Sequence, residues 1–186
     1  MCALGVGQVM PDFAFRMMTW FMKVEDLFGG PERLLKKVPL KPGMTVIDYA
    51  CGPGRYTVPV AETVGPAGKV YAVDNQHLAI EMTLRKVKRR SLTNVQGVLV
   101  KGFDTGLPDA MADVVLLIDA LALIADHQSL FKEIHRLMKP AGLLFVDPTH
   151  MQIASARSII DGTGLFTMVK TDGRSMLLRK QTGVPG

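Results

Sequence analysis

The fold is decided by the stretch Val46-Ile47-Asp48-Tyr49-Ala50-Cys51-Gly52-Pro53-Gly54-Arg55-Tyr56-Thr57. It starts as a short apolar run that includes a carboxylate, and it continues as a Gly-x-Gly turn before a helical pattern. A strand, a glycine turn and a helix in this order are typical of the first unit of an open parallel sheet, where small residues let a ligand approach the backbone. The pattern predicts a ligand site at the carboxyl edge of such a sheet.

Short apolar runs alternate with longer amphipathic segments from residue 44 onward. The runs are continuous, as in strands that are buried on both faces, and they cover residues 45–49, 69–74, 95–100, 113–118 and 142–146. A helix candidate over 153–160 follows, and then two more strand-like runs flank Asp172-Gly173, a signal for a tight hairpin. We therefore expect an α/β fold with a Rossmann-like, doubly wound, seven-stranded sheet that is mostly parallel, with the last strand antiparallel.

The first 40 residues do not fit this alternation. They carry a helical apolar stripe that is rich in methionine and aromatic residues: Phe13, Met17, Trp20, Phe21, Val24 and Leu27. Two interpretations stay open, a helix packed on the domain and a lid whose pliable methionines adapt to a ligand. We divide the chain into an N-terminal helical lid segment, 1–40, and a ligand-binding domain, 41–186.

The formal net charge is +5, and its densest part is the run from Arg85 to Arg90. The run follows a helical pattern, so we interpret it as a helix end at which cations complement the dipole and face water. A nucleic-acid groove is the less favoured interpretation because no aromatic residues are interleaved.

Composition excludes several classes of protein. The longest apolar stretch, 114–125, is interrupted by Asp119 and falls short of the roughly 18–20 residues that a membrane span needs. No secretion signal is recognisable, which favours the cytoplasm. The two cysteines, Cys2 and Cys51, form no metal-binding spacing, so we expect no metal.

The spacing of acidic residues indicates which chemical class of ligand the site binds. Asp74 ends the second strand, twenty positions beyond Gly54, where a carboxylate suits the hydroxyls of a ribose. A dinucleotide site would have a third glycine where Thr57 stands, and Asp48 would repel a diphosphate. The ligand implied has a ribose and an amine but no phosphate.

These residues resemble the class I S-adenosylmethionine-dependent methyltransferases over about residues 40–180. The stretch 48–54 looks like the family's first motif, Asp74 like its ribose-binding acid, and segments 102–108, 112–115, 131–140 and 142–147 like its later motifs in the right order. The closest resemblance is to the small-molecule enzymes of the ubiquinone-biosynthesis type. It implies S-adenosylmethionine as cofactor, held by Asp48, Tyr49, Ala50, Cys51, Gly52, Gly54, Tyr56, Asp74, Asn75, Phe103, Asp104 and Asp119.

The sequence departs from the family at three places. Ala50 stands where the family often has its first glycine. In the loop that resembles the adenine loop, Phe103 follows the glycine and Asp104 comes next, so either the acid shifts into place or the ring packs on the adenine. After the fourth strand, residues 121–123 replace a segment that bears a histidine in many relatives.

Two residues are candidates for catalysis. Asp119 is a carboxylate in an apolar stretch at the end of the fourth strand, and His150 follows the fifth strand at the same edge. Asp119 and Asp147 are similar to the carboxylates of metal-dependent catechol methyltransferases, but Pro148 replaces the expected asparagine. The remaining histidines fit structural positions: His77 and His127 at helix starts, and His135 within a helix.

The expected function is methyl transfer by in-line displacement to a small, partly apolar acceptor. Nucleic acid and membrane are not expected partners, and the oligomeric state stays open. Two alternatives remain: an RNA methyltransferase that uses the run from Arg85 to Arg90 and Lys36-Lys37 as phosphate contacts, and a non-catalytic S-adenosylmethionine-binding subunit.

Overall fold

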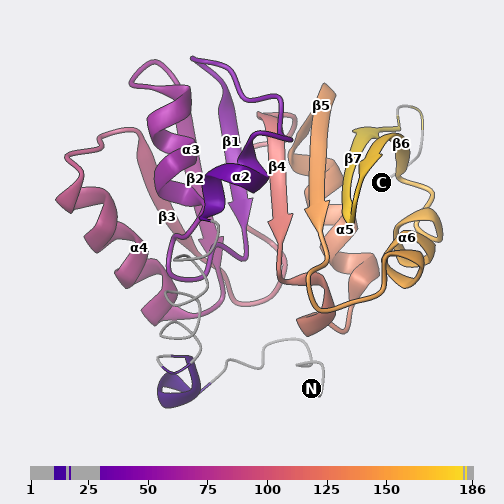
Figure 1. Ribbon diagram of the computed structural model, residues 1–186, viewed down its shortest axis with the longest axis horizontal. Coiled ribbons are helices and arrows are strands. Elements are labelled where there is room, and N and C mark those ends of the chain that lie inside the picture. The colour runs from indigo at the N-terminus through magenta and orange to yellow at the C-terminus, as the bar shows by residue number, and fades with distance from the viewer. Residues whose placement is uncertain (1–10, 16, 18–29, 182, 184–186) are drawn as a thin grey trace.

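A seven-stranded sheet with strand order β3-β2-β1-β4-β5-β7-β6 forms the centre of the computed structural model, which describes residues 11–15, 17, 30–181 and 183 (Figure 1). Strands β1 to β5 are parallel to one another, whereas β7 runs antiparallel to both β5 and β6. The expected architecture is confirmed. The strands are β1 Thr45–Tyr49, β2 Lys69–Asp74, β3 Val95–Leu99, β4 Ala112–Ile118, β5 Met138–Asp147, β6 Phe166–Asp172 and β7 Ser175–Lys180.

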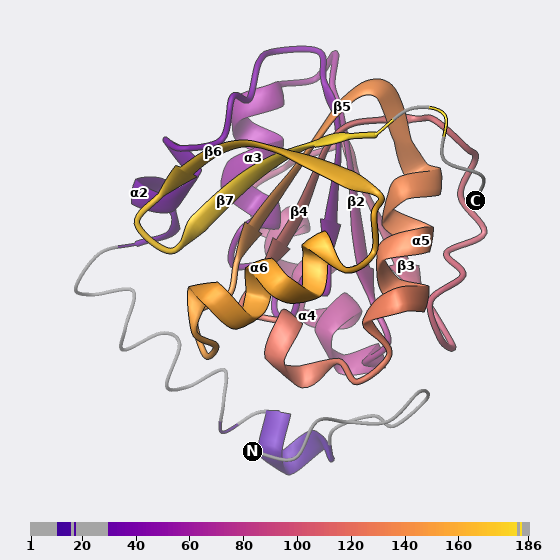
Figure 2. The same ribbon diagram turned by 90° about the vertical axis from the view of Figure 1, so that its right-hand side faces the viewer.

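Helices cover both faces of the sheet, which explains why the strands read as continuous apolar runs (Figure 2). Neighbouring residues of β1 point to opposite faces: Val46 packs in the core under α3, and Ile47 packs in the core under α5. One face carries α2 Pro31–Leu35, α3 Thr57–Val64 and α4 His77–Arg89, and the other carries α5 His127–Leu137 and α6 Ile153–Asp161. Full burial of a large apolar side chain such as Phe131 or Ile134 contributes about 1.5–3 kcal/mol to the free energy of unfolding.

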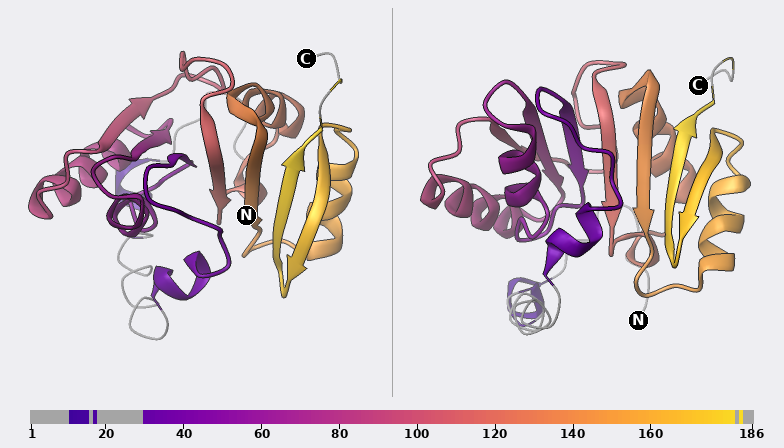
Figure 3. Two further views of the ribbon diagram at one scale, coloured as in Figure 1. Left: turned by 90° about the horizontal axis from the view of Figure 1, so that it is seen from above. Right: turned by 45° about the horizontal axis from the view of Figure 1, so that its top comes forward.

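The strand order reverses between β1 and β4, both of which end at the lower edge of the sheet in Figure 1. In open α/β sheets, ligands bind outside the carboxyl ends of the strands at such a switch point. Residues 11–15 lie below this edge in Figure 1, and the right-hand view of Figure 3 shows them below α2. Phe15 there is buried against Leu78, Ala79 and Met82 of α4.

The start of β5 differs from the expectation. The strand expected over residues 142–146 begins earlier, because α5 ends at Leu137 and β5 begins at Met138. The pairing with β4 jumps from Met138 to Leu143, so the intervening residues bulge out of the ladder. Pro140 has no N–H to donate, which suits it to such a bulge.

The C-terminal hairpin forms as predicted, with its turn shifted by one residue. Asp172 pairs with Ser175, so the turn is Gly173-Arg174 rather than Asp172-Gly173. Gly173 has a φ of 64°, which glycine adopts at little cost.

The apolar stripe predicted at the N-terminus is only partly within the described residues. Phe13 and Met17 are exposed, whereas Phe15, which lies outside the stripe, is 4% exposed. Trp20, Phe21, Val24 and Leu27 lie outside the described residues. Across residues 11–15, 17, 30–181 and 183, the structure contains no helix with the length and apolarity needed to span a membrane.

Candidate active site

The two glycines of the turn after β1 differ in their surroundings: Gly54 packs against α4, whereas Gly52 has open space beside it. The place of a Cβ on Gly54 lies 2.7 Å from the Oγ1 atom of Thr83, whose hydroxyl donates to the Gly52 carbonyl at 3.0 Å. A side chain on Gly54 would therefore force α4 away from the turn. At Gly52, by contrast, no described atom beyond the chain neighbours lies within 4 Å of that place, so a ligand can approach the backbone there.

Asp74 joins the second strand to this turn. One of its carboxylate oxygens accepts the N–H of Gly52 at 2.8 Å, and the other accepts the N–H of Gln76 at 2.8 Å. Burial raises the pKa of Asp74, and the backbone N–H donors oppose that shift. Each oxygen keeps a further lone pair, so the carboxylate can still accept hydrogen bonds from a ligand. Asn75, beside it, is exposed.

Asp48 lies beneath the turn and is 2% exposed. Its carboxylate accepts a hydrogen bond from the Thr57 hydroxyl at 2.6 Å. Burial, together with the nearby charge of Asp74, raises the pKa of Asp48 to about 7. In the sequence, Thr57 is notable only because it stands where a dinucleotide site would have a third glycine. The structure shows that Thr57 is the hydrogen-bond partner of the buried Asp48.

The loop after β3 folds back over the end of β1. The Tyr49 hydroxyl donates to the Phe103 carbonyl at 2.9 Å, and Phe103 is half-buried against the core. Asp104 is exposed and accepts the N–H of Gly106 at 2.9 Å, so its side chain caps its own loop. Buried Thr105 donates to Glu133 of α5, a contact that no sequence motif indicates.

The ends of β4 and β5 form the second part of the edge. Asp119 has a φ of 60°, an uncommon conformation that asparagine and aspartate tolerate, and its N–H donates to the Asp147 carbonyl at 3.0 Å. The Thr149 hydroxyl lies within hydrogen-bond reach of both Asp119 and Asp147. Burial raises the pKa of Asp119, and the Arg55 guanidinium, 3.8 Å away, opposes that shift.

Asp147 is held from the C-terminal hairpin. Its carboxylate accepts the Ser175 hydroxyl at 2.6 Å and pairs with Arg174 at 3.1 Å. His150 is exposed beside this group, and its charge lowers the pKa of Asp119. Among the described residues, no group of three or more His, Cys, Asp or Glu side chains is arranged to hold a metal ion.

The remaining residues of the predicted set are Ala50, which is half-buried with a φ of 59°, and the buried residues Cys51 and Tyr56. Cys51 is 5% exposed, and burial raises the pKa of its thiol, which suits a packing residue rather than a nucleophile. Tyr56 is buried with the Arg55 guanidinium 5.6 Å from its ring centroid. Arg55, Thr149 and Arg174 are absent from the predicted set, because they meet the acids only in the folded chain.

The structure also shows where the other histidines and the basic run lie. His77 and His127 begin α4 and α5, and His135 is buried with its Nε2 atom 2.9 Å from the Gln181 carbonyl oxygen. The run from Arg85 to Arg90 is the end of α4, where Arg85 pairs with Glu81 and Arg90 pairs with Glu62 at 3.1 Å.

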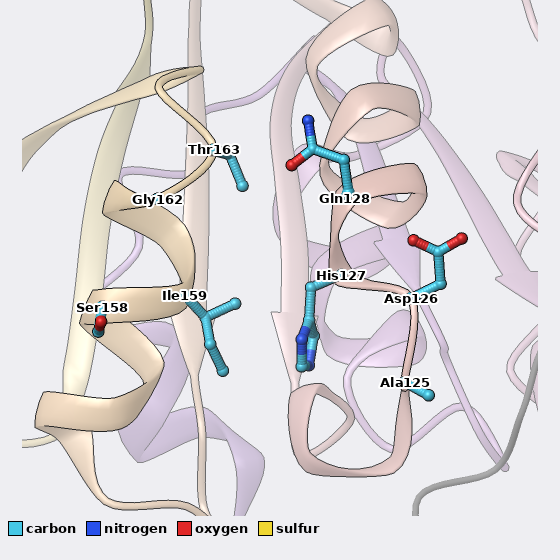
Figure 4. A pocket seen from close by; sticks show the side chains of 8 residues that line it. All are labelled: Ala125, Asp126, His127, Gln128, Ser158, Ile159, Gly162 and Thr163. Atoms are coloured by element: carbon cyan, nitrogen blue, oxygen red, sulfur yellow. The ribbon is translucent and has the colours of Figure 1, made fainter.

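A shallow groove opens elsewhere, between the start of α5 and α6 (Figure 4). His127, Gln128, Ile159 and Thr163 are among its lining residues. None of the carboxylates or glycines of the sheet edge lines it. The groove is therefore separate from the candidate active site.

Comparisons with known proteins identify the family of the chain. A family model described as a methyltransferase domain matches residues 40–168. The demethylmenaquinone methyltransferase of Geobacillus sp. strain WCH70 is 32% identical over 111 residues, which are 60% of this chain and 47% of that protein. The chain spans about half the length of the curated relatives that it matches.

Solved structures show the same fold. A SAM-dependent methyltransferase from Aquifex aeolicus superposes with a TM-score of 0.74 at 24% identity, covering 81% of this chain and 89% of that chain. Coclaurine N-methyltransferase, bound to N-methylheliamine and SAH, superposes with a TM-score of 0.53 at 26% identity over 62% of this chain and 34% of that one.

Proposed function

Since the chain belongs to the class I S-adenosylmethionine-dependent methyltransferases, we propose that it transfers a methyl group from this cofactor to a small, partly apolar acceptor. When bound, the cofactor supplies a methyl group that is attached to a positively charged sulfur. Once the methyl group is transferred, the rest of the cofactor is a neutral thioether. The observation that carries the proposal is the contact of Asp74 with the N–H of Gly52, which places a hydroxyl-binding carboxylate against an open glycine turn.

The residues of the edge fit the cofactor. Asp74 has lone pairs to accept the ribose hydroxyls, and the backbone at Gly52 is accessible. Asp48, when it is ionised above its pKa of about 7, supplies a negative charge beneath the turn, which favours an ammonium-bearing ligand and disfavours a phosphate. The cofactor contacts that we propose come from Asp48, Tyr49, Ala50, Cys51, Gly52, Gly54, Tyr56, Asp74, Asn75, Phe103, Asp104 and Asp119.

The acceptor faces the ends of β4 and β5. An acceptor with an O–H or N–H group loses a proton as it is methylated, and Asp119 is placed to take that proton onto its carboxylate. Arg55, 3.8 Å from Asp119, holds the carboxylate and stabilises negative charge that develops on the acceptor. His150, exposed at the same edge, is the second candidate for the base.

We assign residues 1–40 to a segment that covers the acceptor and residues 41–186 to the cofactor-binding domain. Two observations support this division. The family match begins at residue 40, and Phe15 packs against α4 immediately after the Asp74 turn. A cover at this position would exclude water from the transfer.

The relatives suggest which acceptor to test first. The curated relatives reported above bear the name demethylmenaquinone methyltransferase. Demethylmenaquinone in its reduced form therefore leads an acceptor screen that also contains other small apolar molecules with O–H, N–H or thiol groups.

Calorimetry followed by that screen tests the proposal. We expect S-adenosylmethionine and S-adenosylhomocysteine to bind at a single site, and we expect one acceptor to take up the methyl group. Tight binding of NAD with no binding of S-adenosylmethionine would refute the assignment. Cofactor binding without transfer to any acceptor would favour a non-catalytic subunit, and transfer to tRNA would favour an RNA methyltransferase.

A further inference from the structure

The loop between β3 and β4 has few contacts of its own: within it, the Asp104 carboxylate accepts the Gly106 N–H, and the Thr105 hydroxyl accepts the Leu107 N–H. Gly102 and Gly106 have φ values of 138° and 64°, in regions open mainly to glycine, and glycine loses the most freedom when it is ordered. Of residues 101–110, Thr105 alone is buried; the others are exposed or half-buried. Contacts from outside the loop therefore add to these two in fixing its shape.

A buried glutamate on α5 provides this restraint. One carboxylate oxygen of Glu133, a residue that is 9% exposed, accepts both the N–H and the hydroxyl of Thr105, at 3.0 and 2.6 Å. The other oxygen accepts the Nε of Arg136 at 2.8 Å, and Arg136 also donates to the Leu107 carbonyl at 2.8 Å. The charge of Glu133 is thus satisfied inside the protein, so it is not free to bind a ligand.

The other end of the loop is fixed to the site. The Val100 N–H donates to the Asp74 carbonyl at 3.0 Å, and the Tyr49 hydroxyl donates to the Phe103 carbonyl at 2.9 Å. The backbone of residues 103–104 is therefore held from two sides: by the strand ends that form the candidate active site, and by Glu133 on α5.

We propose that Glu133 is a positioning residue for base recognition: through Thr105 it holds the Phe103-Asp104 backbone where it distinguishes the adenine of the cofactor from other bases. The inference rests on the proposed function, because it takes this loop as the base-binding loop. A site built to hydrogen-bond an amino group discriminates strongly against a ligand that lacks it, provided that its donors and acceptors are held rigidly. Loosening the loop should lower discrimination together with affinity.

The test compares S-adenosylhomocysteine with S-inosylhomocysteine, in which a carbonyl oxygen replaces the adenine amino group. The dissociation constants of both are measured by calorimetry, and their ratio is the readout. In Thr105→Val, which removes the hydroxyl donor at nearly constant volume, and in Glu133→Gln, we expect the ratio to fall about three- to tenfold, the size of one or two hydrogen bonds.

Two matched variants serve as controls. Thr105→Ser keeps the hydroxyl, and we expect it to preserve the wild-type ratio. Glu62→Gln makes the same change as Glu133→Gln at an exposed glutamate that pairs with Arg90, and it should also leave the ratio unchanged. Circular dichroism and thermal melting check that each variant is folded. If Glu133→Gln does not fold, the Thr105→Val and Thr105→Ser pair decides.

An unchanged ratio in folded Thr105→Val would overturn the inference, because the contact would then be structural only. That result leaves the proposed function intact, since the protein would still bind S-adenosylhomocysteine. If the wild-type protein binds neither molecule, the proposed function itself fails and this inference fails with it.

Discussion

The carboxylate of Asp74 accepts the backbone N–H of Gly52 at 2.8 Å across a sequence separation of 22 residues. This hydrogen bond fixes the acid at the end of β2 against the glycine turn that follows β1, although the two belong to different βα units. A ligand that accepts contacts from the turn at Gly52 is therefore within reach of the same carboxylate.

The first prediction concerns this acid. Asp74→Ala should weaken S-adenosylhomocysteine binding by about 1.5–3 kcal/mol, because charge-assisted hydrogen bonds to the ligand are lost. Isothermal titration calorimetry measures the change, with circular dichroism to confirm folding. Asp161→Ala, at an exposed acid on α6, is the control and should leave the affinity unchanged. Wild-type affinity in a folded Asp74→Ala protein would remove Asp74 from the site.

The second prediction concerns the pH dependence that Asp48 imposes on stability. Its pKa is about 7 in the folded chain, above its usual 3.8, so the folded state holds a proton that the unfolded state has released between these values. The free energy of unfolding therefore falls as the pH rises from about 4 to about 7. Asp48→Asn, which stays neutral, should not show this fall, so its stability relative to the wild type should rise by about 1–3 kcal/mol between pH 5 and pH 8.

Denaturant unfolding at the two pH values measures this difference. At pH 8, where Asp48 is ionised, the same variant should bind S-adenosylmethionine more weakly, because the negative charge beneath the turn is lost. Equal stabilisation at pH 5 and pH 8 would show that Asp48 does not titrate in this range.

The third prediction concerns strain in the turn. Ala50 has a φ of 59°, a left-handed conformation that costs a non-glycine residue roughly 1–2 kcal/mol. Ala50→Gly relieves this strain but makes the unfolded chain more flexible, so we expect a net gain of about 0–1 kcal/mol. Ala154→Gly, at an exposed position of α6, should instead lose about 0.5–1 kcal/mol. Chemical denaturation distinguishes the two, and a loss of similar size in both would argue against strain at Ala50.

The fourth prediction concerns the basic end of α4. Arg85 and Arg90 form ion pairs with Glu81 and Glu62, which reduces the charge available for phosphates. Fluorescence titration with tRNA should therefore detect only weak binding that salt abolishes. Micromolar affinity that persists at about 0.2 M salt would instead support RNA as the acceptor.

The fifth prediction concerns the N-terminal segment. Phe15 is buried against Leu78 and Met82, next to the Asp74 turn, so cofactor binding should slow hydrogen exchange at Phe15 and Met17. Deletion of residues 1–28 should leave a folded domain that binds cofactor but does not transfer methyl groups, because the cover over the acceptor is lost. Unchanged exchange, or unfolding of the shortened chain, would make the segment part of the fold instead.

The sequence by itself determined the elements and the first half of the site. Continuous apolar runs in β1, β2, β4 and β5 indicate strands covered on both faces, because each neighbouring side chain meets a different core. The glycines at 52 and 54 and the acid at 74 are recognisable because backbone geometry restricts the residue types that fit there.

Only the tertiary structure decided the partners of the acids. Thr57 lies under Asp48, Glu133 holds Thr105, and Ser175 and Arg174 reach Asp147 from the last hairpin. Sequence spacing also misplaces the buried residue of the N-terminal segment and the start of β5. The physical reason is the same in each case: a hydrogen bond or a packing contact between distant residues depends on how the strands are ordered and paired in the sheet, whereas local sequence patterns reflect only backbone preference and the burial of neighbouring side chains.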